Sequence, residues 1–378
     1  MQTFFRFFKN IKHSVKAACF GLIFFLLTLT DCTGTPIDNK KLFAIPVKNV
    51  VGTEITVQKE VAVNDEEVVI EELIESPEPP VPDGPLLASA FREVWGYVIT
   101  GRESALTAGM PVSDVCYFSA EIDSYGKLGA VPNRNRISFP GRVHLVIVCH
   151  SASLIHFSIL PGSRERRELV DDIVAAARNY DGLQINFEGV PARDGDAFVT
   201  FLQELRSRLR NKIFSVAIPA RTRRITNDVY DYERIKPHVD RMLIMAYDEH
   251  WSGSSPGSIA SLQWCRNVAT YCMNVIGPEK LVMGIPFYGR TWGNYSPSRA
   301  LIYDSVADII KERNVKTARE ESIPTFDYNV NVQIKVYYED AYSLTTRMDM
   351  YKKMNVSSIG FWRLGQETKD VWKYLHLE

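Results

Sequence analysis

The chain has 378 residues, a hydrophobic content of 46% and a formal net charge of -1 at pH 7. This length leaves room for one catalytic-sized domain of roughly 250 residues, such as an α/β barrel, after an N-terminal tail. The near-zero charge, without a basic stripe or a Gly-rich phosphate loop, argues against nucleic acid as a partner.

Residues 1–32 have the pattern of an export signal. Basic side chains precede an apolar run from Ala17 to Leu29 that is short for a membrane span. The run ends in Leu29-Thr30-Asp31-Cys32, a loose lipoprotein cleavage box in which Asp31 departs from the usual small residue. We expect an exported protein that is secreted or held at the cell envelope or membrane. Lipidation of Cys32, ordinary cleavage and a retained anchor all stay open.

Residues 33–87 have the composition of a flexible acidic and Pro-rich linker. Between residues 60 and 85 there are nine acidic side chains and no Lys or Arg, and the segment ends in five prolines from Pro77 to Pro85. Such a stretch repels itself and favours extended backbone. The Val-rich piece from Val61 to Val69 is the alternative, a short strand. We expect the folded domain to span residues 88–378.

From Val94 onward, short apolar runs alternate with amphipathic segments, which indicates an α/β fold. Eight runs predict strands, and eight is the number in a closed parallel barrel. The predicted strands are Val94–Ile99, Val115–Ala120, Val143–Cys149, Gly182–Phe187, Phe214–Ile218, Met242–Tyr247, Leu281–Phe287 and Ser358–Leu364.

The segments between these runs predict helices at Arg164–Asn179, Asp196–Arg210, Ser261–Cys272 and Ser343–Met354. The gaps between the first three strands are short, so any helices there must be small or degenerate. Polar runs in Tyr295–Val336 predict an insertion between the seventh and eighth strands. The expected fold is a TIM (β/α)8 barrel. The alternative is an open doubly wound sheet, but no G-x-G-x-x-G follows the first strand.

The segment from Asp181 to Glu188, D-G-L-Q-I-N-F-E, alternates polar and apolar residues. Side chains two apart on a strand share a face, so Gln184, Asn186 and Glu188 form one polar row. Such groups are costly to bury without hydrogen bonds, and a barrel carries its active site at the carboxyl ends of its strands. The row is either part of an active site or the ordinary polar face of a half-buried edge strand.

Aromatic residues gather at the ends of three later strands. They lie in M-A-Y-D-E-H-W from residue 245, I-P-F-Y-G-R from residue 285 and G-F-W from residue 360. Tyr and Trp side chains stack on the apolar faces of sugar rings while their polar atoms stay paired. One such aromatic is more often core packing. Their coincidence on several strand ends with Glu188 predicts a carbohydrate site.

These four motifs, in this order, resemble glycoside hydrolase family 18, the chitinase-like barrels, over about Val94 to Leu377. The D-G-L-Q-I-N-F-E segment is similar to the D-x-x-D-x-D-x-E strand of the family. The extension Y-D-E-H-W-S-G-S-S-P-G is similar to that of peptidoglycan-acting, spore-germination-type N-acetylglucosaminidases. The resemblance implies a TIM barrel that acts on an N-acetylglucosamine-containing glycan, such as peptidoglycan or chitin, without a cofactor.

The resemblance also implies roles for individual residues. Glu188 is expected to be the general acid and then the general base, and the substrate's own 2-acetamido oxygen to be the nucleophile. Asn186 and Tyr247 take the other two catalytic positions, and Tyr247 is expected to hydrogen-bond the acetamido oxygen. The substrate-binding candidates are Asp181, Gln184, Asp248, Trp362, Tyr288, Arg290, Tyr97, Phe118 and Trp251.

The chain departs from the family pattern at two positions, because Asn186 and Gln184 stand where the family usually has Asp. Asn accepts a hydrogen bond from the acetamide but brings no negative charge to the cyclised oxazolinium intermediate. Retention of Glu188, Tyr247, Asp248 and Trp362 favours a hydrolase. The alternatives are a catalytically impaired, glycan-binding barrel and a barrel that serves only as an envelope scaffold.

The remaining Cys and His residues are expected to be structural. No spacing of Cys and His indicates a metal site, and we expect neither a metal nor a cofactor. Cys265 and Cys272 lie about two helical turns apart, too far for an easy disulfide. His144 and His156 alternate with apolar residues and are expected in the core or at its rim. His250 is a candidate for the rim of the site.

Overall fold

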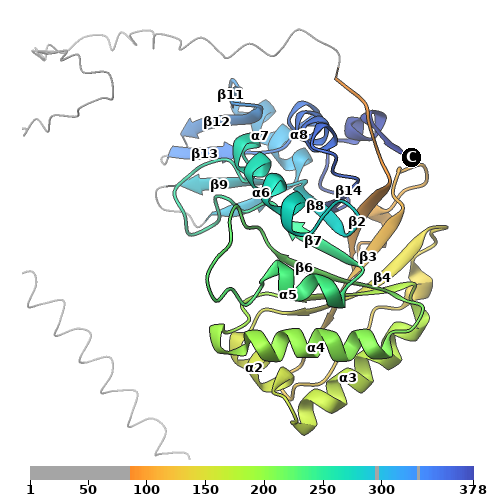
Figure 1. Cartoon of the computed structure of the whole chain (residues 1–378). Coiled ribbons are helices and arrows are strands. Elements are labelled where there is room, and N and C mark those ends of the chain that lie inside the picture. The colour runs from red at the N-terminus through yellow and green to blue at the C-terminus, as the bar shows by residue number, and fades with distance from the viewer. Residues whose placement is uncertain (1–85, 294–297, 330–332) are drawn as a thin grey trace, which may run out of the picture. The chain divides into compact units, whose positions relative to one another are not determined.

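The computed structural model describes residues 86–293, 298–329 and 333–378 (Figure 1). The predicted signal segment, and all but the last two residues of the predicted linker, lie outside these ranges. Within them, no helix is long and apolar enough to span a membrane.

Eight parallel strands close into a barrel in the order β14-β2-β3-β4-β5-β6-β7-β8. All eight predicted strands are confirmed, and the open doubly wound sheet is wrong because β14 pairs with both β8 and β2. The barrel strands are β2 (Glu93–Ile99), β3 (Asp114–Glu121), β4 (Arg142–Cys149), β5 (Gly182–Phe187), β6 (Ile213–Pro219), β7 (Arg241–Met245), β8 (Leu281–Pro286) and β14 (Ser358–Trp362).

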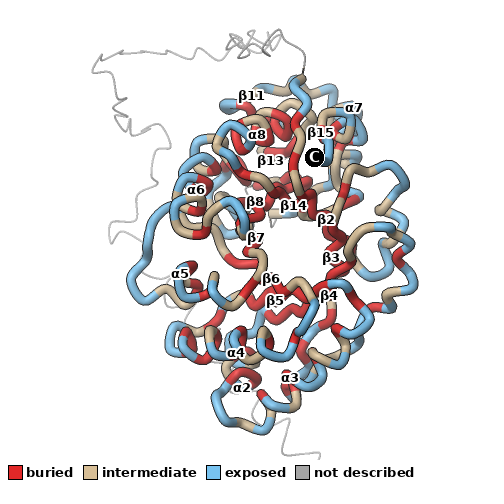
Figure 2. Tube along the Cα trace, turned by 45° about the vertical axis from the view of Figure 1, so that its right-hand side comes forward, coloured by how far each residue is buried: buried red, intermediate tan, exposed pale blue. Residues whose placement is uncertain are grey.

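The barrel strands are apolar on both faces because each face is covered. One face of each strand points into the barrel, where Trp95, Tyr97, Val146, Leu243 and Val282 belong to an interior cluster of buried side chains. The other face packs against the surrounding helices in a second, larger core. Figure 2 shows the buried strands as a ring, with exposed positions concentrated outside it. This packing makes the barrel a filled core with its active face at one end.

Helices cover the outside of the barrel, with one exception, and all four predicted helices are confirmed. The helices are α2 (Ala152–Ile159), α3 (Arg164–Ala176), α4 (Gly195–Arg208), α5 (Tyr232–Ile235), α6 (Leu262–Val275), α7 (Tyr303–Arg313) and α8 (Ala341–Lys353). The exception is α7, which packs against the sheet of the insertion. The connections that follow β2 and β3, both fully described, hold 3-10 turns in place of α-helices, as their short length predicts.

The insertion between β8 and β14 carries a small antiparallel sheet of its own, in the strand order β10-β9-β13-β12-β11. The insertion begins earlier than the predicted Tyr295, because β9 begins at Gly289, within the seventh-strand motif. Its strands are β9 (Gly289–Gly293), β10 (Arg299–Leu301), β11 (Ala318–Glu320), β12 (Ile323–Asn329) and β13 (Gln333–Tyr337). A final pair, β1 (Ser89–Phe91) and β15 (Leu375–Leu377), joins the two ends of the described chain.

A buried charge network lies at the amino-terminal end of the strands, opposite the expected active face. Asp114 accepts hydrogen bonds from Arg142 at 2.6 and 2.7 Å and lies 2.8 Å from the fully buried His144. Glu93 binds Arg241 at 2.7 and 2.9 Å and Arg142 at 3.2 Å. Burial raises the pKa of Asp114, but hydrogen bonds from His144 and Arg142 outweigh it and lower the pKa to about 2. The network therefore holds Asp114 ionised.

We predict that Asp114→Asn destabilises the barrel by about 3 kcal/mol at pH 7, because the fully buried carboxylate that pairs with Arg142 is lost from the network. The folded pKa of Asp114 lies below the usual value of 3.8, so its stabilisation is complete above pH 3.8 and is lost as the pH falls through about 2. The difference in the free energy of unfolding between the unmutated protein and Asp114→Asn should therefore shrink by about 2 kcal/mol over this pH range.

Urea unfolding at several pH values measures this difference. Asp171→Asn is the matched control, because Asp171 forms an exposed pair with Arg208 and its loss should cost less than about 1 kcal/mol. If the difference in the free energy of unfolding between Asp114→Asn and the unmutated protein does not change with pH, the lowered pKa of Asp114 is contradicted.

Candidate active site

A cavity of about 610 Å³ opens at the carboxyl ends of the barrel strands. This volume lies within the usual range for small-ligand sites. Eight of its lining residues were predicted as site residues: Phe118, Asn186, Glu188, Tyr247, Asp248, Tyr288, Arg290 and Trp362. The other lining residues are His150, Pro219, Ala220, Met245, Trp264, Ala300 and Gln366.

Asn186 lies near the carboxyl end of β5 and Glu188 directly after it, and both line the cavity. The two are separated by one residue and therefore share a face. The Asn186 side-chain amide donates to Glu188 Oε1 at 3.2 Å. The Glu188 side chain is 42% exposed, so its carboxyl is open to a ligand. The Asn186 Oδ1 atom is buried and has no hydrogen-bond partner among the described residues.

Tyr247 enters the cavity just after β7, where it packs against β8. Gly284 makes this approach possible, because a Cβ atom there would lie 2.9 Å from the Tyr247 ring and 2.7 Å from the Ile244 carbonyl oxygen. Burial, followed by the charges of Glu188 and Asp248, raises the pKa of Tyr247 well above its usual value. Tyr247 therefore stays protonated at neutral pH and presents a hydrogen-bond donor.

Asp248 is held beside Tyr247 by two donors from the start of the insertion. Tyr288 donates its hydroxyl to Asp248 Oδ1 at 2.6 Å, and Arg290 Nη2 donates to the same oxygen at 3.0 Å. The Oδ2 atom has no hydrogen-bond partner within the described ranges. Asp248 itself has a φ of 58°, a left-handed conformation that Asp tolerates better than most residues. The arrangement leaves one carboxylate oxygen free to accept from a ligand hydroxyl.

Trp362, at the end of β14, forms an aromatic wall with Phe118 of β3. Each is followed by a cis peptide bond. The two rings meet edge to face with their centroids 4.7 Å apart. Tyr97 supports Trp362 from below at 5.3 Å. A flat indole braced in this way is a suitable platform for the apolar face of a sugar ring.

Two predicted substrate contacts lie inside the barrel and do not line the cavity. Gln184 is fully buried, accepts from the Tyr97 hydroxyl at 2.5 Å and donates to Ser215 at 3.2 Å. Tyr97 is itself only 2% exposed. Both were predicted from the correct face of their strands, but the structure does not bring them into the cavity lining. They form a hydrogen-bonded layer that supports Trp362.

Asp181 and Trp251 are also not brought into the cavity. Asp181 precedes β5, at the opposite end of the strand from Glu188, and its carboxylate accepts from the Val143 backbone N–H at 2.9 Å. Asp181 therefore does not line the cavity, and its carboxylate links β4 to β5. Trp251 lies in the loop after β7, is 55% exposed and does not line the cavity. His250 points to the Ser258 carbonyl at 2.8 Å.

Sequence reasoning missed His150, which lies directly after β4. Its Nδ1 atom is 3.7 Å from Glu188 Oε2. The signal was its position immediately past the carboxyl end of a barrel strand. Trp264 of α6 and Ala300 of β10 had no such signal, because they reach the cavity from a helix and from the insertion.

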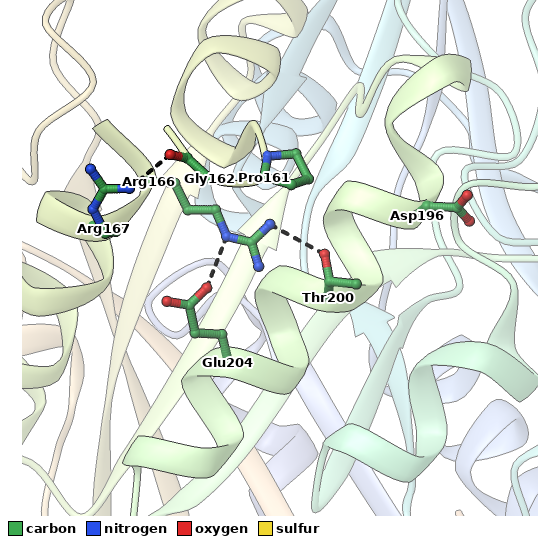
Figure 3. A pocket seen from close by; sticks show the side chains of 7 residues that line it. All are labelled: Pro161, Gly162, Arg166, Arg167, Asp196, Thr200 and Glu204. Atoms are coloured by element: carbon green, nitrogen blue, oxygen red, sulfur yellow. Dashed lines mark hydrogen bonds and ion pairs between the residues drawn. The ribbon is translucent and has the colours of Figure 1, made fainter. Parts of the chain in front are cut away.

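A second hollow, of about 400 Å³, lies outside the barrel against α3 and α4 (Figure 3). Its central side chain, Arg166, donates to Glu204 at 2.9 Å and to Thr200 at 3.2 Å (Figure 3). Arg166 also donates to the Ile159 carbonyl at 3.1 Å. These contacts use the hydrogen-bonding groups of Arg166 within the protein. We therefore interpret the hollow as part of the packing between α3 and α4 and not as a reactive site.

The Cys and His residues predicted to be structural are found in structural roles. Cys116, Cys149, Cys265 and Cys272 are buried and free. His144 pairs with Asp114, and His156 Nδ1 lies 2.8 Å from Asp194. In the described part of the chain, no group of three or more metal-ligating side chains comes together.

The fold and the cavity together define a glycosidase barrel. The sequence profile of Glycosyl hydrolases family 18 matches residues 135–367, and the chain belongs to this family.

The curated relatives from Bacillus subtilis include an uncharacterized glycosylase and a cortical fragment-lytic enzyme. The uncharacterized glycosylase YvbX is 28% identical over 229 residues, which are 57% of this chain and 67% of the relative. The cortical fragment-lytic enzyme is 24% identical over 324 residues, which are 79% and 75% of the two chains. Among solved structures, the Bacillus cereus spore cortex-lytic enzyme SleL superposes with a TM-score of 0.69 at 22% identity, over 77% of this chain and 76% of SleL.

Proposed function

We propose that this protein hydrolyses β-1,4 linkages next to N-acetylglucosamine in a cell-wall glycan, with Glu188 as the general acid and base. The observation that carries the proposal is the meeting of an exposed carboxyl, Glu188, with a protonated Tyr247 hydroxyl and the Trp362 platform in one cavity. A glycan-binding protein has no need for a carboxyl in that position.

In the proposed mechanism the substrate supplies its own nucleophile. The oxygen of the 2-acetamido group attacks C1, the C1–O bond of the leaving sugar breaks, and Glu188 protonates the departing oxygen. A water molecule then attacks C1 of the cyclised oxazolinium while Glu188 takes the proton of the water. The acetamide re-forms, and the product retains the β configuration.

The other cavity residues take positioning roles in this mechanism. The Tyr247 hydroxyl donates to the acetamido oxygen, and the free Asp248 Oδ2 accepts from a neighbouring sugar hydroxyl. The unpaired Asn186 Oδ1 accepts from the acetamide N–H. Tyr288 and Arg290 hold Asp248 in place.

Peptidoglycan is the preferred substrate over chitin. Two of the similar proteins are named for lysis of cortical fragments and of spore cortex. This likeness supports a bacterial wall glycan, and the N-terminal signal predicted from the sequence would carry the domain to it.

Asn186 supports a second candidate function, a glycan-binding barrel with impaired turnover. An amide at this position supplies no negative charge to the oxazolinium. Loss of such a charge-assisted contact costs on the order of 2 to 4 kcal/mol, or about thirty- to a thousandfold in rate.

We predict that Glu188→Gln lowers the release of reducing ends from purified peptidoglycan at least about a hundredfold, because general acid–base catalysis is lost. The matched control is Glu121→Gln, since Glu121 lies exposed at the end of β3 and outside the cavity. It should leave the rate unchanged.

The same assay separates the two candidate functions. If neither the parent nor Glu188→Gln releases reducing ends, yet both bind N-acetylglucosamine oligomers and Trp362→Ala does not, the protein is a glycan-binding barrel. If Glu188→Gln and Glu121→Gln lower the rate of reducing-end release equally, Glu188 is not the general acid and base.

We predict that Asn186→Asp raises kcat by about tenfold or more. The amide nitrogen lies 3.2 Å from Glu188, and two carboxyl groups at such a distance share one proton. That proton would serve the acid step, and the new charge would stabilise the oxazolinium. The measurement is steady-state hydrolysis of an N-acetylglucosamine oligomer. The control is Asn267→Asp on the exposed face of α6; an unchanged or lower kcat in a folded Asn186→Asp variant would refute the expectation.

A further inference from the structure

His150 is a titratable residue of the cavity that has no role in the mechanism proposed above. It lines the cavity directly after β4, and its side chain is 61% exposed. Within the described ranges, neither of its ring nitrogens forms a hydrogen bond. His144, His156 and His250, by contrast, each have a ring nitrogen 2.8 Å from a partner oxygen. The imidazole of His150 is therefore available to a group in the cavity.

The pairing of β4 with β5 sets His150 beside Glu188. The two strands are parallel, and Val148 lies opposite Asn186. The Glu188 N–H donates to the Cys149 carbonyl at 2.9 Å, which continues the ladder past the last pair. Because side chains two apart on a strand share a face, Glu188 continues the face of Asn186. By the same rule His150 continues the face of Val148, which belongs to the cluster inside the barrel.

A helix cap fixes the backbone on the other side of His150. Ser151 is the N-cap of α2, and its side-chain oxygen accepts from the Leu154 N–H at 3.4 Å. The Ser151 carbonyl accepts from the Ile155 N–H at 2.8 Å. A strand before His150 and a helix after it hold its backbone in place, so its side-chain torsions are the part that can adjust.

The Glu188 carboxyl has a hydrogen-bond donor on one oxygen only, within the part of the chain that the structure describes. The Asn186 amide donates to Oε1 at 3.2 Å. His150 Nδ1 lies 3.7 Å from Oε2, which is longer than a hydrogen bond. A small change in the His150 torsions would close this gap, and hydrogen bonds between catalytic groups are often long before a ligand binds. Donors would then hold both oxygens of the carboxyl.

We propose that His150 is a positioning residue for Glu188, whose Oε2 accepts from the His150 Nδ1–H when a glycan fills the cavity. This inference rests on the proposed function. Each carboxylate oxygen can accept two hydrogen bonds, so Oε2 can accept from His150 and still face the leaving oxygen. A carboxyl held at both oxygens keeps its orientation from the acid step, in which it gives up a proton, to the base step, in which it takes one.

A matched pair of variants separates the hydrogen bond from the volume of the side chain. Asn carries an N–H donor as many bonds from the backbone as His Nδ1, and Leu has the shape of Asn without a donor. Hydrolysis of an N-acetylglucosamine oligomer is measured for the unmutated full chain, His150→Asn and His150→Leu. The control is His376→Leu, on the exposed side of β15 and outside the cavity. Urea unfolding checks that each variant is folded.

We expect His150→Leu to lower kcat about tenfold, because a catalytic group that is misplaced loses rate. The KM should change less than about twofold, because His150 acts on Glu188 and not on the bound sugar. His150→Asn should keep kcat within about threefold of the unmutated chain, and His376→Leu should change neither constant. Equal losses of kcat in His150→Asn and His150→Leu would overturn the proposal. So would an unchanged kcat in His150→Leu, or an effect confined to KM.

Nuclear magnetic resonance tests the same contact without turnover. Long-range proton–nitrogen spectra of the full chain with isotope-labelled histidine show which ring nitrogen carries the hydrogen at about pH 8, where an imidazole is mainly neutral. A sulfur-linked N-acetylglucosamine oligomer serves as a ligand that is not cleaved. His150 should carry a hydrogen on Nδ1 in the complex and lose this preference in Glu188→Ala. A hydrogen on Nε2 alone, or an Nδ1–H that persists in Glu188→Ala, would contradict the contact.

Failure of the contact is distinguishable from failure of the proposed function. If the unmutated chain releases reducing ends but His150 carries no hydrogen on Nδ1, hydrolysis stands and His150 does not position Glu188. If the Nδ1–H depends on Glu188 but the unmutated chain releases no reducing ends, the contact stands and hydrolysis is wrong.

Discussion

The pairing of β14 with β2 is the constraint on which the whole cavity depends. These strands are the last and the first of the barrel in sequence, and their parallel register joins Ser358 to Glu93 and Phe361 to Gly96. Closure places the carboxyl ends of all eight strands at the same end of the barrel. Glu188, Tyr247 and Trp362 therefore lie in one cavity although they are distant in sequence. An open sheet with the same strands would spread these side chains along an edge.

The negative charge in the cavity depends on which strands end in a carboxyl side chain. Glu188 receives the Asn186 amide on one oxygen and lies near His150 on the other, while Asp248 is held by Tyr288 and Arg290. No second carboxyl stands beside Glu188 on β5. The positive charge of an oxazolinium would therefore meet less negative charge from β5 than a carboxyl pair provides, and slow turnover is the expected consequence.

The strands and the shared face of Asn186 and Glu188 were predictable, because apolar runs and period-two alternation reflect local geometry. The depth of a side chain along the barrel axis could not be predicted from the sequence. Gln184 and Tyr97 share the correct face but lie one layer below the cavity, and Asp181 lies roughly 20 Å from Glu188 by the rise of a strand. Trp264 and Ala300 reach the cavity through tertiary packing that no local pattern encodes. His150, just past β4, had a readable signal, and so did Pro219 and Met245, which end β6 and β7.

The anomeric configuration of the first product tests the central claim most directly. Proton NMR of an N-acetylglucosamine oligomer during early hydrolysis distinguishes the β anomer from the α anomer before they equilibrate. The substrate-assisted mechanism at Glu188 predicts that the β anomer appears first, because two inversions at C1 restore the original configuration. Initial release of the α anomer would mean that water attacks C1 directly, and would contradict the mechanism.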